Sequence, residues 1–113
     1  MIRSVTAVGA LLTAVMAVAC KDSGLRGDNF YSAQLLPHIG YHEFEGVTVE
    51  AGERERLVRD IGDKPAVMLR NHGLLAWGPS VPQAFVMLWT LQRACDVQIA
   101  ASRAGAVRSI RPE

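Results

Sequence analysis

The sequence has little net charge and none of the common signatures of nucleotide-binding or hydrolytic sites. Its 113 residues include 12 basic and 11 acidic side chains, which gives a formal net charge of +1. Without a basic excess there is no electrostatic case for a nucleic acid or an anionic membrane as a partner. The sequence also has no glycine-rich phosphate loop, no Gly-x-Ser-x-Gly motif and no paired zinc-binding cysteines. The sequence therefore gives no indication of a phosphate-loop nucleotide site, a Gly-x-Ser-x-Gly hydrolase or a cysteine-based zinc site.

Cysteine is also scarce. The sequence holds two cysteines, Cys20 and Cys95, far apart and without a Cys-x-x-Cys pattern. This is not a disulfide framework, and it favours reduced thiols in a cytoplasmic protein. Half of the residues are hydrophobic and a fifth are charged, which is typical of a globular chain. The length predicts one small domain, residues 1–113, with one core.

The N-terminal stretch allows two interpretations. Residues 4–19 are almost wholly apolar or small, with Arg3 before them and Cys20 after them. This pattern is typical of a secretory signal, or of a lipoprotein signal cleaved before Cys20. The same residues also suit a buried strand at 4–8 followed by a buried helix over 11–22. The run is too short and too rich in alanine to predict a membrane span.

The rest of the chain alternates between helical and strand patterns, which predicts an α/β arrangement. The segments are a helix over 30–36, strands near 39–42 and at 47–50, a helix over 51–61, strands at 66–69 and 74–77, and a helix over 81–104. Asp28 or Asn29 is expected to cap the first helix, and Pro37 to end it. The helix over 51–61 is dense in charge, so we expect it to be solvated.

The last helix has the clearest periodicity. Ser80 is a plausible cap, and Gly105 is expected to stop the helix. Its apolar positions at helical spacing are Ala84, Phe85, Leu88, Leu91, Cys95 and Ile99. Met87 and Trp89 lie off this stripe. They predict a second buried face, covered by a neighbouring helix or another subunit.

Three histidines are the remaining candidates for site chemistry. His72 lies in the turn Arg70–Gly73, between the two short apolar strands, where a rigid scaffold would hold it at a strand end. An imidazole that only bonds to backbone is the simpler interpretation from these residues alone. His38 and His42 are four apart, but Pro37 disfavours a helical ligand face there. A catalytic zinc needs three protein ligands, and His72 has no obvious partners in the sequence.

Five blocks in a fixed order carry a resemblance to a known family. They are Ile39–Gly46, Glu53–Leu57, Met68–Gly78, Ala84–Phe85 and Leu91–Cys95. The Asn-His-Gly-Leu-Leu run that begins at Asn71 is the most specific of them. From about Ala17 onward, the chain resembles the class II aldolase/adducin family. The resemblance implies a three-layer α/β/α sandwich, here incomplete at the N-terminus.

In the enzymes of that family, zinc polarises a substrate carbonyl during reversible aldol cleavage of small sugar phosphates or related hydroxy-carbonyl compounds. The resemblance implies that a His-x-His pair and the histidine of the Asn-His-Gly turn hold the metal. His72 matches that third metal ligand. The resemblance aligns Gly9 and Leu11 with the two histidines of the His-x-His pair, and neither of these side chains ligates zinc. The family's acid/base glutamate falls further upstream, so no catalytic residue is assigned in this chain.

We therefore expect a partial class II aldolase/adducin-like domain with impaired zinc-dependent lyase chemistry. Whether it is an enzyme stays open. The first alternative is a non-catalytic assembly module, for which the adducins are the family precedent. A lesser alternative is an exported lipoprotein fragment. The family match favours a helix over an export signal at 16–25, and it favours a homo-oligomer. From the net charge and the scarce cysteines we expect a cytoplasmic location and no membrane or nucleic-acid partner.

Overall fold

The computed structural model describes residues 24–46 and 52–110, and these form an α/β fold. The elements in chain order are α1 (Phe30–Leu35), the 3₁₀ helix η1 (Leu36–His38), β1 (Ile39–His42), α2 (Glu53–Ile61), β2 (Ala66–Leu69), β3 (Gly73–Ala76) and α3 (Val81–Ala104). The strand and helix predicted at 4–8 and 11–22, the export signal and the strand at 47–50 lie outside the described residues. No helix in the described part is long and apolar enough to span a membrane.

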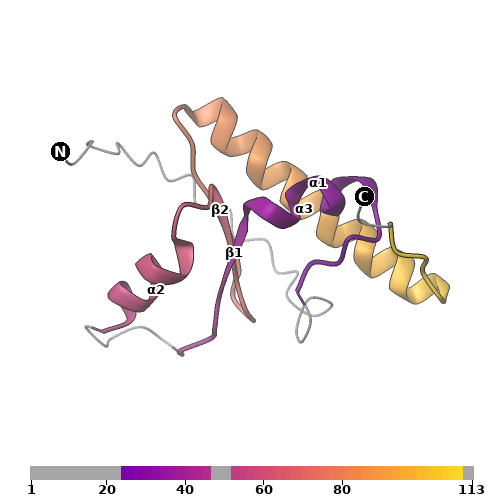
Figure 1. The fold of residues 1–113 in the computed structure, drawn as a ribbon, viewed down its shortest axis with the longest axis horizontal. Coiled ribbons are helices and arrows are strands. Elements are labelled where there is room, and N and C mark those ends of the chain that lie inside the picture. Colours follow the sequence, from indigo (N-terminus) through magenta and orange to yellow (C-terminus); the bar gives the residue numbers. More distant parts are fainter. Residues whose placement is uncertain (1–23, 47–51, 111–113) are drawn as a thin grey trace.

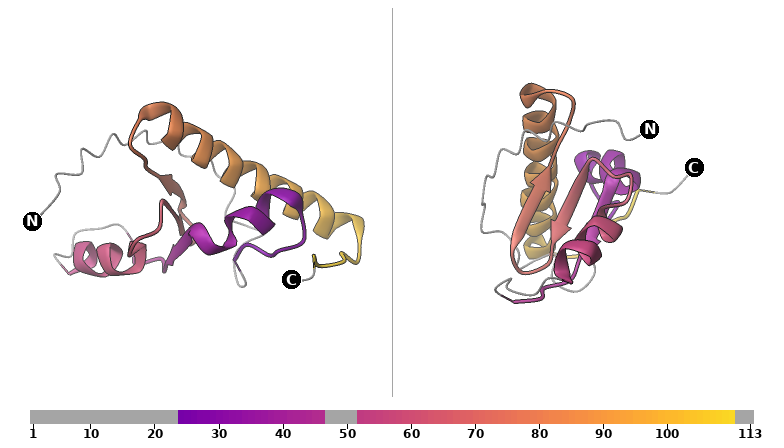
Figure 2. Two further views of the ribbon diagram at one scale, coloured as in Figure 1. Left: turned by 45° about the horizontal axis from the view of Figure 1, so that its top comes forward. Right: turned by 90° about the vertical axis from the view of Figure 1, so that its left-hand side faces the viewer.

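The three strands form one mixed sheet in the order β1–β2–β3. β1 runs parallel to β2, with His42 beside Leu69. β2 and β3 form an antiparallel hairpin. α2 lies on one side of the sheet, and α3 with α1 lies on the other (Figures 1 and 2). The predicted α/β class is confirmed.

The core lies between the sheet and α3. Side chains alternate between the two faces of a strand, so Ile39 and Met68 point to the same side as Ala66 and Ala76. Leu91 of α3 is fully buried against this face. α2 contributes no buried residue, which confirms the prediction of a solvated helix.

The prediction for α3 is correct in its bounds and wrong in one residue of its stripe. Phe85 is 54% exposed. It lies about 100° around the helix from Ala84, which is buried. Trp89, predicted on a second buried face, is 45% exposed and meets the ring of Tyr31 edge-on at 6.2 Å. Among the described residues, α1 covers part of that face.

Two local features place α1 and α2. The Asn29 side chain accepts hydrogen bonds from the backbone N–H groups of Tyr31 and Ser32, so Asn29 is the cap of α1. At Gly40 a Cβ atom would lie 2.7 Å from the carbonyl oxygen of Asp60. Only glycine permits this approach, which seats the end of α2 directly against β1.

Candidate functional site

Two histidines lie at the same edge of the sheet. β1 ends at His42 and the parallel strand β2 ends at Leu69, its partner in the register. The turn that carries His72 and the loop that follows His42 therefore leave the sheet side by side. The Arg70 N–H donates a 2.9 Å hydrogen bond to the carbonyl oxygen of His42, which fixes the two segments together. The carboxyl ends of parallel strands are a common location for binding sites.

His72 lies on the tight turn between β2 and β3, as predicted. Asn71 has φ of 56°, the left-handed conformation that asparagine tolerates. The His72 N–H donates to the Leu69 carbonyl oxygen at 3.1 Å. The His72 residue is exposed. In the described ranges, no group of three or more potential metal ligands close enough to share an ion includes His72.

His42 is the buried histidine of the fold. Its side chain is 5% exposed and points from β1 toward α2. Its Nδ1 lies 2.8 Å from Oδ2 of Asp60. This hydrogen bond from the imidazole is the main reason why the pKa of Asp60 is lowered, against the opposing effect of burial. Asp60 is therefore ionised at neutral pH and can only accept, so Nδ1 carries the hydrogen.

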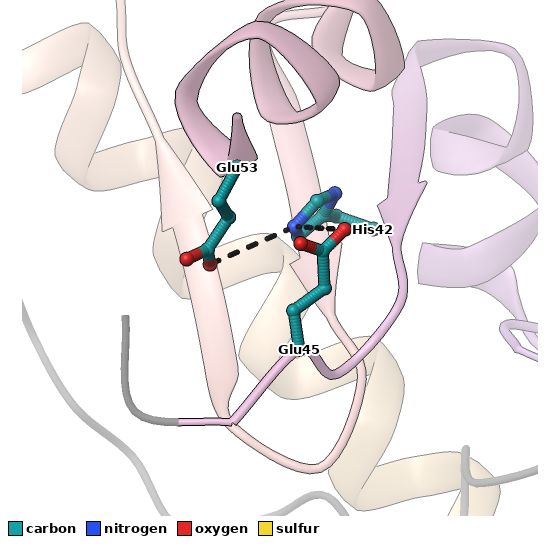
Figure 3. Close-up of side chains that lie close together, drawn as sticks. All are labelled: His42, Glu45 and Glu53. Atoms are coloured by element: carbon teal, nitrogen blue, oxygen red, sulfur yellow. Dashed lines mark ion pairs between the residues drawn. The ribbon is translucent and has the colours of Figure 1, made fainter. Parts of the chain in front are cut away.

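The other ring nitrogen of His42 faces two carboxylates. Nε2 lies 3.9 Å from an oxygen of Glu45 and 3.9 Å from an oxygen of Glu53 (Figure 3). It is buried and has no hydrogen-bond partner. A buried polar atom without such a partner is destabilising by about 1–3 kcal/mol, so it is rare and calls for an explanation.

The two glutamates are held by different elements. Glu45 follows β1, and Nε of Arg56 on α2 donates to its Oε1 at 2.8 Å. The bond to Arg56 is the first cause of the lowered pKa of Glu45. Glu53 is the first residue of α2, and its side chain is 16% exposed. Within the described ranges, His42, Glu45 and Glu53 form the one group of three whose ligand atoms lie within 4.8 Å of one another.

Sequence reasoning missed this cluster. It weighed His42 only with His38, on the question of a helical ligand face. The structure places His42 in a strand and the exposed His38 in η1, so the two do not share a helix. The available signal was weak: a His-x-x-Glu spacing after a strand, with a second glutamate at the start of the next helix.

Comparison with known proteins identifies the family. The model of the class II aldolase and adducin N-terminal domain matches residues 10–99. The chain belongs to the class II aldolase/adducin family. It is 42% identical over 91 residues to a Pseudomonas aeruginosa protein whose name places it among the class 2 aldolases, covering 80% of this chain and 35% of that protein. It is 37% identical over 68 residues to rat alpha-adducin, covering 59% of this chain and 9% of adducin.

Solved structures of class II aldolases share the fold. An aldolase II superfamily protein from Pseudomonas syringae has a TM-score of 0.79 at 40% identity, covering 86% of this chain and 40% of that one. The L-fuculose 1-phosphate aldolase from Glaciozyma antarctica has a TM-score of 0.67 at 24% identity, covering 86% of this chain and 36% of that one. This chain therefore spans little more than a third of the length of these aldolase relatives.

Proposed function

We propose that this chain is a class II aldolase/adducin-like domain that does not, by itself, carry out zinc-dependent aldol cleavage. The observation that carries the proposal is the setting of His72 on an exposed turn, outside any three-ligand group of the described residues. Gly9 and Leu11, which we align with the family's His-x-His pair, have no ligand atoms and lie outside the described residues. The family's zinc therefore does not fit here, since one imidazole holds zinc weakly and without a defined open position.

An aldol-cleavage assay tests this proposal. L-Fuculose 1-phosphate, the compound in the name of one structural relative, is incubated with the chain and excess zinc. We expect no release of aldehyde above the protein-free control, because zinc is not held where it could polarise the carbonyl. His72→Ala and the matched variant His38→Ala, which removes another exposed imidazole, should leave that result unchanged. Zinc-dependent cleavage that His72→Ala abolishes would show the proposal to be wrong.

Assembly is the second candidate function, and the outer face of α3 favours it. Val81, Phe85, Val86 and Trp89 are each 45–60% exposed on this helix. Beside them lies an open hollow of about 420 Å³, lined by Leu35, Pro82, Gln83, Val86, Met87 and Thr90. An exposed apolar patch of this kind is typical of an interaction surface. We propose that a second copy of this chain covers it, in keeping with the homo-oligomer expected for the family.

Sedimentation of the purified chain measures assembly directly. We expect a dimer or larger species at micromolar concentration, and a monomer for the double variant Val86→Glu/Trp89→Glu, because burying two carboxylates opposes association. The matched double variant Glu43→Gln/Glu55→Gln, away from this face, should sediment like the parent. A parent chain that is monomeric at every concentration would exclude the second candidate. The cytoplasmic location stays a prediction, which fractionation of cells that express the chain would test.

A further inference from the structure

One ring nitrogen of the buried His42, Nε2, has no hydrogen-bond partner. Nδ1 carries its hydrogen toward Asp60, so Nε2 is the ring atom left to bind a metal ion through its lone pair. That lone pair faces the carboxylates of Glu45 and Glu53 at 3.9 Å each. An arrangement of three electron-rich groups around one point is unfavourable unless a proton or a metal ion lies between them.

We propose that His42, Glu45 and Glu53 form a divalent-cation site, with zinc as the ion that fits best, and that Asp60 is its positioning residue. This site uses none of the residues that the family resemblance assigns to the aldolase metal. It therefore goes beyond the function proposed above and does not depend on it. One imidazole with two carboxylates matches the donor preferences of zinc and manganese, and the imidazole favours zinc.

The geometry is close to what zinc requires. Tetrahedral zinc, with bonds of about 2.0–2.2 Å, sets its ligand atoms roughly 3.4 Å apart. The two carboxylate oxygens lie 3.9 Å from Nε2, and all three ligand atoms lie within 4.8 Å of one another, so zinc binding requires the glutamate side chains to move inward. Glu45 and Glu53 are the partly exposed members, at 23% and 16%, and have room for this movement. Three protein ligands leave a fourth position for water.

The hydrogen bond that would orient His42 as a metal ligand is present in the fold. A metal-bound histidine usually donates its other N–H to a carboxylate, which fixes the tautomer and the ring orientation. Asp60 does this for His42, with Nδ1 and Oδ2 2.8 Å apart. The glycine at position 40 allows the approach of α2 that brings Asp60 there. The site is therefore assembled by the fold, with ligands from the end of β1, the loop after it and the first turn of α2 (Figure 3).

Two arginines beside the cluster are expected to lower its affinity for a divalent cation. Arg56 binds Glu45, and Arg59 binds the outer oxygen of Asp60. Two guanidinium groups near three carboxylates weaken the attraction for a dication. We therefore expect zinc to bind in the micromolar range and not in the range of a closed structural site.

Zinc titration against a chromophoric chelator at pH 7 tests the proposal. The parent should bind one equivalent in the micromolar range, and both His42→Gln and Glu53→Gln should weaken binding at least about tenfold. Two matched acid variants, Glu43→Gln beside the site and Glu55→Gln on the outer face of α2, should bind zinc like the parent. His72→Ala should also bind like the parent.

Circular dichroism of every variant confirms folding before titration, and Asp60→Asn supplies a second readout. Asp60 touches no ion, so Asp60→Asn should keep the stoichiometry and weaken affinity by about 10- to 100-fold. A parent without micromolar zinc binding overturns the proposal. Equal binding by folded Glu53→Gln and by the parent overturns it too, as does loss of binding in His72→Ala.

Discussion

Restoring two histidines at positions 9 and 11 should raise the zinc affinity of the His72 site by at least about 100-fold. In the family the metal has three imidazole ligands, and the resemblance aligns Gly9 and Leu11 with the two that this chain lacks. One imidazole fixes neither the position nor the coordination number of zinc. Three imidazoles do both, which converts weak association into a defined site.

The measurement is a zinc competition titration of Gly9→His/Leu11→His in a Glu53→Gln background, so that the His42 cluster contributes little. Adding His72→Ala to that protein should abolish the gain, because the new pair would again lack its third ligand. The same double substitution at Ala7 and Thr13 is a matched control that also adds two histidines. If the variant at 9 and 11 binds zinc no better than this control, the assignment of the lost ligand positions is wrong.

Replacing Gln98 by alanine should lower the free energy of unfolding by about 2–4 kcal/mol. Gln98 is 1% exposed on α3. Its amide oxygen accepts a 2.8 Å hydrogen bond from the Arg26 N–H, and its amide nitrogen donates to the Gly24 carbonyl oxygen at 3.0 Å. Alanine would remove the partner of the buried Gly24 carbonyl and of the part-buried Arg26 N–H and would open a cavity, and both effects are destabilising.

Denaturant unfolding of Gln98→Ala measures this loss, and Gln92→Ala is the matched control on the same helix. The side chain of Gln92 donates a 2.9 Å hydrogen bond to Asp96, one turn along the same helix. The Gln92→Ala variant should therefore lose less than about 1 kcal/mol of unfolding free energy. Hydrogen exchange at the Arg26 amide should accelerate in Gln98→Ala alone. Equal losses in the two variants would mean that the link from α3 to residues 24–26 contributes no special stability. The free energy of unfolding of a native protein is about 5–15 kcal/mol, so the loss predicted for Gln98→Ala is a large fraction of it.

Local signals explain which elements were predictable. α3 has the predicted bounds because Ser80 and Gly105 flank one continuous helical pattern. β1 and β2 also match their predicted ranges, and β3 begins one residue early, at Gly73. The parallel pairing of β1 with β2 could not be predicted from such signals, because it joins residues 27 apart, such as His42 and Leu69, through α2.

The two histidines show the same limit for the site. His72 could be placed on its turn because asparagine and glycine mark that turn in the sequence. The environment of His42 depends on Asp60 and Glu53, which α2 brings back against β1 through the close approach at Gly40. The sequence near His42 offers only a weak signal for Glu53, the glutamate that starts the next helix, and none for Asp60. A spacing rule for metal ligands fails when the ligands come from a strand, a loop and a helix.

We propose that the cation-binding histidine of this chain is His42 and not His72. A zinc titration followed by NMR of the imidazole rings tests it most directly, because the chain has only three histidines, His38, His42 and His72. We predict that the His42 resonances change first and saturate at one equivalent, while those of His38 and His72 stay in place. Saturation of the His72 resonances with no change at His42 would show that the cation site is not at His42.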